Sequence, residues 1–592
     1  MAEDKQSDFA ANPRMLAISG IAVCVGVFGA VVAWALFHLI GLFTNLFYYH
    51  RIAWSFVSPA GSYLGGWALL APVVGGLIVG FMARYGSERI RGHGIPEALE
   101  AILFGKSIMQ PKIAVLKPLS SAVVIGSGGP FGAEGPIIMT GGAVGSLVAM
   151  IFALTANERR TLLVAGAAAG MAATFNTPIA ATLLSVELLL FELKPRSLIP
   201  VALAAATAAA LRPYLLGDGA LFPIPAGLMV NDLGLLSAVA CGLLAAMLST
   251  LLTMSVYACE DLFRKLPIHW MWWPALGGIA IGVGGHFEPH ALGVGYDVIH
   301  DLLNGQYLVL AAMALLLVKL AIWAISLGSG TSGGILAPLL IMGAGLGVLE
   351  GTFLPGASPL IWPVVSMGAM IAGTMRSPLT AIVFTLELTH DITSLKPLLI
   401  ACIVAHAFSV IIMKRSILTE KVARRGLHVF REYSVDPLGT LFVRDVMSRE
   451  VASISGTLTV AEARSRYFDP ATQKFRAYPV TDDGGRLLMV VSRLEIQRYY
   501  ELDPALSLAE HARSGTPAVT NPEETCQQAA ARMAIENLDR LPVVSEDGSM
   551  RLVGIVTRFD VVKALLAHYE SDRVTERLLK LPIKGTRRSQ GG

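Results

Sequence analysis

The most constraining feature of this sequence is an internal duplication. Segments of the first 190 residues recur in the same order further along the chain, at an offset that stays between 200 and 202 residues. The clearest pairs are "APVVGGLIVG" with "WPALGGIAIG", "GHGIPEALEAI" with "GVGYDVIHDLL", and "GMAATFNTPIAATLLSVEL" with "AMIAGTMRSPLTAIVFTLEL". Chance does not hold one register over so many residues, so this region is expected to fold as two copies of one unit.

Composition places the duplicated unit in a membrane. Hydrophobic residues make up 54% of the chain and charged residues only 15%, whereas soluble domains carry nearer a quarter charged residues. The first apolar run is too long for the apolar core of a cleaved leader, so it is predicted to be a first membrane helix. Residues 1–14 before it are predicted to be a cytoplasmic N-terminus. Runs long enough to span a bilayer occur at 15–48, 67–84, 235–258, 308–328 and 397–413.

Shorter apolar segments in both copies are interrupted by glycine and proline. Lipid tolerates non-helical backbone only where protein or a water-filled cavity surrounds it, and duplicated transporters bind their substrates at such breaks near the midplane. A site between the two copies is therefore predicted. The sequence alone leaves open whether the copies are parallel or inverted.

Three apolar helices are predicted to begin directly after glycine-rich loops, at 92–96, 132–136 and 333–338. The first N–H groups of a helix are unpaired and carry a partial positive charge, which suits an anion without a cationic side chain that would trap it. A cation would need rings of carbonyl or carboxylate oxygens instead. This pattern favours anion permeation.

Glu134 is a lone carboxylate within the loop "GSGGPFGAEGP". A charged carboxylate in such surroundings is costly unless a positive group receives it, and helix starts that hold an anion also hold a carboxylate. Glu134 is therefore predicted to be a gate that competes with the permeant anion. The alternative is a glutamate that stabilises the start of a helix at a water-facing end.

"GHGIPE", "GAEGP" and "GGILAP" resemble the three signature motifs of the CLC family of chloride channels and proton–chloride antiporters, which usually read GSGIPE, G-(K/R)-EGP and GxFxP. The resemblance covers about residues 15–425. It implies an all-α polytopic membrane protein of the CLC fold, with inverted repeats at about 15–215 and 216–425, and a homodimer with one anion pathway per subunit. It also implies that Glu134 is the gating glutamate and that the anion meets His93, Gly94, Ile95, Ala133, Glu134, Gly135, Gly334, Ile335 and Leu336, largely through backbone amides.

Three positions depart from the family pattern. His93 replaces a serine that donates a hydroxyl to the central anion; an imidazole N–H can take over that role, or the ring caps local carbonyls and never touches the ion. Leu418 aligns with the pore tyrosine. Leu188 aligns with the inner glutamate that relays protons in antiporters, which favours a channel and leaves an antiporter as the alternative. The matched glutamates Glu187 and Glu387 are expected to tie helix ends to neighbouring backbone.

The basic stretch "MKRSILTEKVARRGLHVFREY" after the last span predicts a cytoplasmic C-terminal region. After a linker at 426–440, residues 441–500 and 512–568 resemble a tandem cystathionine-β-synthase (CBS) pair of α/β units, followed by a tail at 569–592. Such pairs commonly bind adenine nucleotides, and Thr557 and Asp560 match the contacting Thr-x-x-Asp pattern. A purely structural role in dimerisation is the alternative.

The expected function is therefore chloride transport by a voltage- or pH-gated channel in the plasma membrane, regulated by the CBS pair, with an antiporter as the runner-up. A CBS-regulated cation transporter would need more converging acids than this membrane region offers. No enzyme, required cofactor, metal or nucleic-acid partner is expected, because the net charge is only +3, the five cysteines are scattered, and His286 and His290 lack a third ligand.

Overall fold

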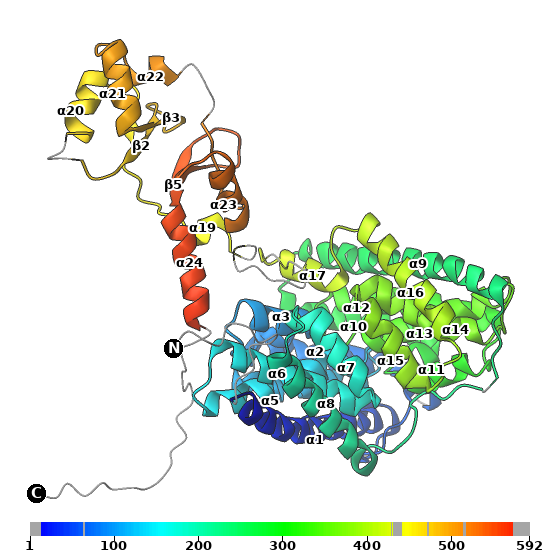
Figure 1. The fold of residues 1–592 in the computed structure, drawn as a ribbon. Helices are drawn as coiled ribbons and strands as arrows, with labels where there is room; N and C mark the ends of the chain where they lie inside the picture. Colours follow the sequence, from blue (N-terminus) through cyan, green and yellow to red (C-terminus); the bar gives the residue numbers. More distant parts are fainter. Residues whose placement is uncertain are drawn as a thin grey trace, which may run out of the picture. The chain divides into compact units, whose positions relative to one another are not determined.

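The computed structural model describes residues 14–62, 65–225, 227–427, 441–469, 473–512 and 517–571, together with Val429 and Leu438. These residues form two compact units, one ending at residue 427 and the other beginning at Val429 (Figure 1). The predicted N-terminal segment 1–14, the linker 426–440 and the tail 569–592 lie wholly or largely outside the described residues.

The first unit is built of helices in two successive sets. The first set comprises α1 (Arg14–Tyr49), η1 (Pro59–Gly61), η2 (Gly65–Leu69), α2 (Ala71–Tyr85), η3 (Glu88–Ile90), α3 (Ile95–Leu103), α4 (Pro111–Gly126), α5 (Glu134–Ile151), α6 (Ala156–Phe175), α7 (Pro178–Leu184), η4 (Ser185–Leu190) and α8 (Pro195–Leu215). The second set comprises α9 (Asp232–Arg264), η5 (Trp270–Trp272), α10 (Trp273–Phe287), η6 (Pro289–Ala291), α11 (Tyr296–Leu303), α12 (Val309–Gly328), α13 (Leu336–Glu350), α14 (Ile361–Met375), α15 (Pro378–Thr389), α16 (Leu395–Ile412) and α17 (Ile417–Ala423).

Within the described residues, seven helical segments are long and apolar enough to cross a membrane. They include all five runs predicted from the sequence; the run at 67–84 is the short helix η2 continued by α2. Shorter apolar helices, among them α13, α14 and α15, pack against the long helices α9, α12 and α16. The chain is therefore a multi-pass membrane protein with broken helices inside the bundle.

The two sets of helices face each other through reciprocal glycine contacts between α2 and α10. A methyl group on Gly76 would lie 2.4 Å from the carbonyl oxygen of Pro274, and one on Gly278 would lie 2.5 Å from the carbonyl oxygen of Pro72. Each contact is the repeat-related image of the other. Glycine at these positions lets the two helices pack backbone against backbone.

Helices α7 and α15 show how the repeats are oriented. Glu387, near the end of α15, accepts hydrogen bonds from the N–H groups of Ile179 and Ala180 at the start of α7, at 3.0 and 2.8 Å. Glu187, in η4 directly after α7, accepts from the N–H group of Thr380 at the start of α15, at 2.8 Å. These equivalent helices therefore run antiparallel, which is the geometry of inverted repeats. The prediction that both glutamates tie helix ends to neighbouring backbone is confirmed.

The second unit is α/β and carries the two predicted CBS repeats. Its elements are α19 (Val443–Val446), β1 (Ile454–Ser455), α20 (Val460–Tyr467), β2 (Ala477–Thr481), β3 (Leu487–Ser492), α21 (Arg493–Leu502), α22 (Leu508–His511), α23 (Cys526–Ile535), β4 (Arg540–Val544), β5 (Leu552–Thr557) and α24 (Arg558–Ser571). Strand β2 pairs in parallel with β1 and antiparallel with β3, and β4 pairs antiparallel with β5.

The start of the second unit does not pack where sequence order places it. Val443, in the segment predicted to open the first CBS repeat, lies in the apolar core of the second repeat with Ala529, Leu541 and Val556. Ser448 forms a β-bridge with Ile555 of β5. The second repeat is thus completed by chain that precedes the first.

Candidate functional site

The glycine-rich loops before α5 and α13 meet inside the first unit. Gly132 and Gly334 form an antiparallel β-bridge, in which the N–H of Gly132 donates to the carbonyl of Gly334 at 3.2 Å and the reverse bond measures 2.9 Å. The loop before α3 joins them, since the N–H of Gly333 donates to the carbonyl of Gly92 at 3.4 Å. The structure therefore brings together all three helix starts that the sequence singled out.

Glycine is required where these loops touch. A methyl group on Gly135 would lie 1.8 Å from the carbonyl oxygen of His93, and one on Gly94 would lie 2.5 Å from the carbonyl oxygen of Gly135. Gly94 also has a φ of +89°, which side chains other than hydrogen rarely adopt. The backbones of α3 and α5 thus approach each other more closely than any other residue type would allow.

Glu134 is the first residue of α5, and its side chain is fully buried at 0% exposure. The carboxylate lies between two of the loop glycines: a methyl group would fall 1.8 Å from Oε2 if placed on Gly132 and 2.5 Å from it if placed on Gly334. Neither carboxylate oxygen has a hydrogen-bond partner within normal distance and angle among the described residues, although the N–H groups of Glu134 itself and of Ala337 are close enough to stabilise the charge. The carboxylate therefore occupies the joint N-terminus of α5 and α13. This burial contradicts the alternative of a water-facing helix cap.

Two predicted anion-binding positions use their amides within the protein. The N–H of Gly94 donates to the carboxylate of Glu97 at 3.0 Å, and the N–H of Gly334 donates to Gly132. In this conformation these two N–H groups are therefore used within the protein, and anion binding at Gly94 and Gly334 stays a prediction. Elsewhere in the site, no backbone acceptor among the described residues is bonded to the N–H groups of Ala133, Glu134, Gly135, Ile335 and Leu336.

His93 and Ile95 are both buried at the start of α3. The imidazole of His93 is 2% exposed, and its Nδ1 has no hydrogen-bond partner among the described residues. This favours the interpretation in which the ring serves an ion over the one in which it caps local carbonyls. Leu418 is fully buried in α17, and the hydroxyl of Tyr257 donates to the carbonyl of the preceding residue, Ile417.

Leu188, at the position aligned with the inner proton-relaying glutamate, is fully buried in η4. This segment is a single π-helical turn, a geometry that recurs at functional sites. The next acid, Glu192, is bound by Lys194 at 3.0 Å and by the hydroxyl of Ser197. Leu188 has no carboxylate, and the carboxylate of Glu192 is already paired. Neither residue therefore offers a free carboxylate to a proton at this turn.

Sequence reasoning missed a pair of buried lysines. Nζ of Lys117 in α4 donates to the carbonyls of Ile90 and Gly92, at 2.8 and 2.7 Å, and to the hydroxyl of Ser332 at 3.0 Å. Lys319 occupies the equivalent position in α12. The sequence does contain a signal for these buried lysines, because both lie in apolar runs and are separated by the repeat offset.

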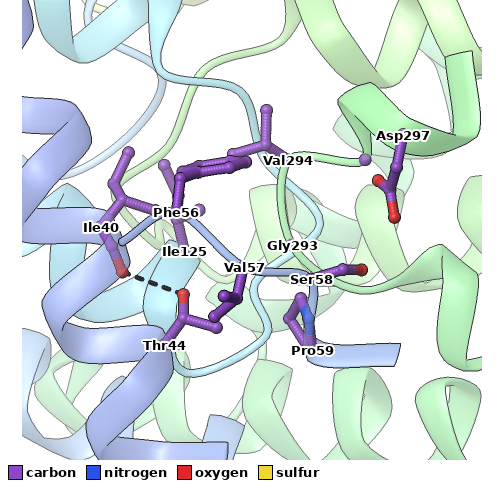
Figure 2. A pocket seen from close by; sticks show the side chains of 11 residues that line it. Ile40, Thr44, Phe56, Val57, Ser58, Pro59, Ile125, Gly293, Val294 and Asp297 are labelled. Carbon is purple, nitrogen blue, oxygen red and sulfur yellow. Dashed lines mark hydrogen bonds between the residues drawn. The ribbon is translucent and has the colours of Figure 1, made fainter. Parts of the chain in front are cut away.

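The second repeat's counterpart of the His93 loop is closed. Residues 293–295 precede α11 and border a pocket of about 10 Å³, which holds no more than about one water molecule. Figure 2 shows Ile40, Phe56, Val57 and Ile125 crowding this space. The loops related by the duplication therefore differ in use: the first-repeat copy is joined to the glycines beside the gate, Gly135 and Gly333, and the second-repeat copy borders this small apolar pocket.

The basic turn after α17 is joined to α3. Arg425 pairs with the buried carboxylate of Glu97 at 2.7 Å and with Glu100 at 2.5 Å, and Lys421 lies 3.7 Å from Glu97. Glu97 is the same residue that holds the Gly94 amide. The end of the membrane unit is thus fastened to the loop that carries His93.

In the second unit, Thr557 and Asp560 form the start of α24. The N–H and Oγ1 of Thr557 donate to Oδ2 of Asp560 at 2.8 and 2.7 Å. In the first repeat, the N–H of Ser492 donates in the same way to Glu495 at 2.7 Å. In this conformation both acids serve as helix caps.

Comparisons with known proteins divide the chain in the same way. A family model described as voltage gated chloride channel matches residues 74–410, and CBS domain models match residues 443–501 and 514–567. The putative chloride channel protein ClcB-like of Ralstonia nicotianae is 31% identical over 351 residues, covering 57% of this chain and 82% of that protein.

Two solved structures share the fold at low sequence identity. A slow cyanobacterial Cl⁻/H⁺ antiporter aligns with a TM-score of 0.61 and 22% identity over 70% of this chain and 99% of its own. A eukaryotic CLC transporter aligns with a TM-score of 0.61 and 21% identity over 92% of this chain and 98% of its own.

Proposed function

The chain belongs to the voltage-gated chloride channel family, and from this premise we propose that it carries chloride across a membrane through the site that Glu134 occupies. The observation that carries the proposal is the buried carboxylate at the joint start of α5 and α13. When it is ionised, it takes the place of an anion; when it is protonated or displaced, the amides of Ala133, Glu134, Gly135, Ile335 and Leu336 become available to chloride.

The finer proposal is a channel gated by pH or voltage, because Leu188 cannot carry a proton through the inner half of the protein. The alternative is proton-coupled antiport, the activity named for the cyanobacterial structural relative. Another carboxylate or a chain of water molecules would then have to replace the missing glutamate.

We also propose that the protein is a homodimer with its C-terminal unit in the cytoplasm. Exposed apolar side chains on α7, α8, α15 and α16 support a partner surface: Ile179, Leu203, Leu379 and Ile403. The basic residues after α16, from Lys414 to Arg425, support a cytoplasmic position for that end of the bundle.

For the CBS pair we propose regulation by an adenine nucleotide at Thr557 and Asp560, with a structural role as the alternative. Binding requires the carboxylate of Asp560 to exchange its helix-cap hydrogen bonds with Thr557 for a bond to a ribose hydroxyl.

Proteoliposomes containing the full chain test the proposed chloride transport and its mechanism. Efflux of chloride from loaded vesicles, with potassium and magnesium efflux as controls, is expected for the protein and not for empty vesicles. The reversal potential under a pH gradient then separates the mechanisms: a chloride channel follows the chloride gradient alone, whereas an antiporter shifts with pH. Cation efflux without chloride efflux would contradict the proposed function.

A further inference from the structure

A cavity of about 350 Å³ lies outside the set of residues that surround Glu134 and plays no part in the pathway described above. Its lining includes Arg212 at the end of α8, Tyr296 at the start of α11, Thr174 at the end of α6, and the side chains of His38 and Trp54. It combines one cationic side chain with hydroxyl, imidazole and aromatic groups.

The cavity lies toward the opposite end of α6 from α17. Arg160, in the first turns of α6, donates a hydrogen bond to the carbonyl of Leu190 in η4. The same turn, η4, carries Glu187, which binds the start of α15. Arg376, two residues before α15 begins, donates at 2.8 Å to the carbonyl of Ser409 in the last turn of α16, the helix that precedes α17. Helix α6 has 20 residues and is therefore about 30 Å long, and Thr174 is at its far end.

Arg212 is a buried cation without an acidic partner. It is 5% exposed; one terminal nitrogen donates to the carbonyl of Gly217, and Nε has no hydrogen-bond partner among the described residues. None of the ion pairs among the described residues includes Arg212. The acid that influences it, Asp218, is exposed and accepts a hydrogen bond from the N–H of Gly219. A buried guanidinium left in this state is costly, so the cavity favours a negative ligand.

Tyr296 offers a second donor in the same cavity as Arg212. Its hydroxyl is inaccessible and has no hydrogen-bond partner among the described residues, yet it lies within electrostatic range of both Arg212 and Glu134. Its ring is fixed by aromatic rings with centroids 5.7 to 6.3 Å away, those of Phe37, Phe56, Phe175 and Phe222. The hydroxyl is thus held in place without being used by the protein.

We propose that Arg212 and Tyr296 form a binding site for a small monovalent anion, at which chloride is held before it exchanges with the carboxylate of Glu134. The loop that carries the gate has no cation of its own, since Ala133 precedes Glu134. Arg212 supplies positive charge from a different helix, α8. This inference rests on the proposed function, because it assumes that chloride is the anion transported.

The test is the chloride dependence of uptake of labelled chloride into proteoliposomes, with chloride binding to the detergent-purified full chain measured by titration calorimetry. Arg212→Gln removes a charged donor, and we expect the half-saturating chloride concentration to rise about tenfold, with the maximal rate changed less than about twofold. Arg212→Lys keeps the charge and should stay within about threefold of the unmodified protein. The matched control, Lys396→Gln, removes one exposed charge outside the cavity and should change nothing.

Tyr296→Phe keeps the test decisive if Arg212→Gln fails to fold. This change removes a hydroxyl that no described residue binds and leaves the ring packing intact, and it should raise the half-saturating concentration about threefold. Unchanged chloride dependence in both folded variants, or in Tyr296→Phe alone when Arg212→Gln does not fold, would overturn the anion site. Absence of chloride uptake by the unmodified protein would instead refute the proposed function, and the calorimetric comparison of the same variants would still decide the inference.

Discussion

Lys117 and Lys319 are repeat-related lysines that perform the same contact on two different loops. Lys117 donates to Gly92 at 2.7 Å, in the loop that carries His93, and Lys319 donates to Gly293 at 3.3 Å, in the loop closed by apolar side chains (Figure 2). Both ammonium groups are fully buried. The duplication has therefore kept the same lysine contact in both copies, although one loop packs against Gly135 beside the gate and the other borders a small apolar pocket.

Replacing each lysine by methionine separates these two roles. Lys117→Met leaves the carbonyls of Ile90 and Gly92 and the hydroxyl of Ser332 without this donor, and each unsatisfied buried group costs about 1–3 kcal/mol. We expect both variants to lose thermal stability, measured by fluorescence-detected size exclusion after heating. Lys117→Met should in addition lose more than about tenfold in chloride flux, because a shift of the loop carrying His93 disturbs the site. Equal losses of flux in both variants at matched stability would contradict this division.

Glu134→Gln tests the gate directly. The amide keeps the size of the side chain but cannot ionise, so it no longer competes as an anion for the helix starts. We expect chloride flux that no longer depends on pH between about 4.5 and 7.5 and that equals or exceeds the flux of the unmodified protein. Complete loss of chloride transport in a folded Glu134→Gln protein would instead make Glu134 a structural residue.

Gly132→Ala should displace the gate without altering its chemistry. The added methyl group would lie 1.8 Å from Oε2 of Glu134, so the carboxylate must leave its present position. Flux at neutral pH is expected to rise toward the Glu134→Gln level while the glutamate remains. Gly345→Ala in α13 is the control, because its methyl group would meet its nearest atom at 3.7 Å, an ordinary contact. A Gly132→Ala protein that gates normally would show that the carboxylate is not held between these glycines.

The glycine loops and the lone Glu134 were predictable because each is local: a loop, a proline and a helix start follow one another in the sequence. The inversion of the repeats was implied by the family resemblance and not by the residue pattern itself, since it depends on contacts such as Glu387 with Ala180, some 200 residues apart. The sequence also shows which amides begin a helix without showing which ones pair across loops, as the N–H groups of Gly94 and Gly334 do.

The Arg212–Tyr296 pair illustrates a different limit. Arg212 belongs to no motif, and Tyr296 follows a glycine loop whose first-repeat counterpart carries His93. The sequence around either residue therefore does not indicate that the two share a site. Their proximity results from the packing of α8 and α11 around α6. By contrast, Lys117 and Lys319 could have been detected from the sequence. Burying a lysine in an apolar helix costs free energy unless its ammonium group finds hydrogen-bond acceptors, and two such lysines stand at the repeat offset.

Glu187→Gln and Glu387→Gln are expected to reduce stability and leave transport unchanged. Each carboxylate accepts backbone N–H groups of the opposite repeat, and glutamine has only one acceptor oxygen, so one donor loses its partner at a cost of about 1–3 kcal/mol. The two glutamates act at opposite ends of α7, so the double variant should lose the sum of the single effects. Resistance to unfolding in a detergent titration measures these losses, and strong non-additivity would indicate that the two caps are coupled.

Cys526 gives a measurable test of the packing between the start of the second unit and its second repeat. The thiol is fully buried, its Sγ lies 3.5 Å from the carbonyl of Phe442, and burial raises the pKa of the thiol to about 11. Because only the thiolate reacts, alkylation at pH 8 should be about 100-fold slower than for the same thiol in the unfolded chain, and it should accelerate as pH rises toward 11. Since unfolding lowers the pKa, stability conferred by the neutral thiol is present below pH 9 and is lost as pH rises through 11. Mass spectrometry of the tryptic peptide follows the labelling, with the protein unfolded in denaturant as the control; rapid labelling of the native chain at pH 8 would show that segment 441–448 does not cover the second repeat.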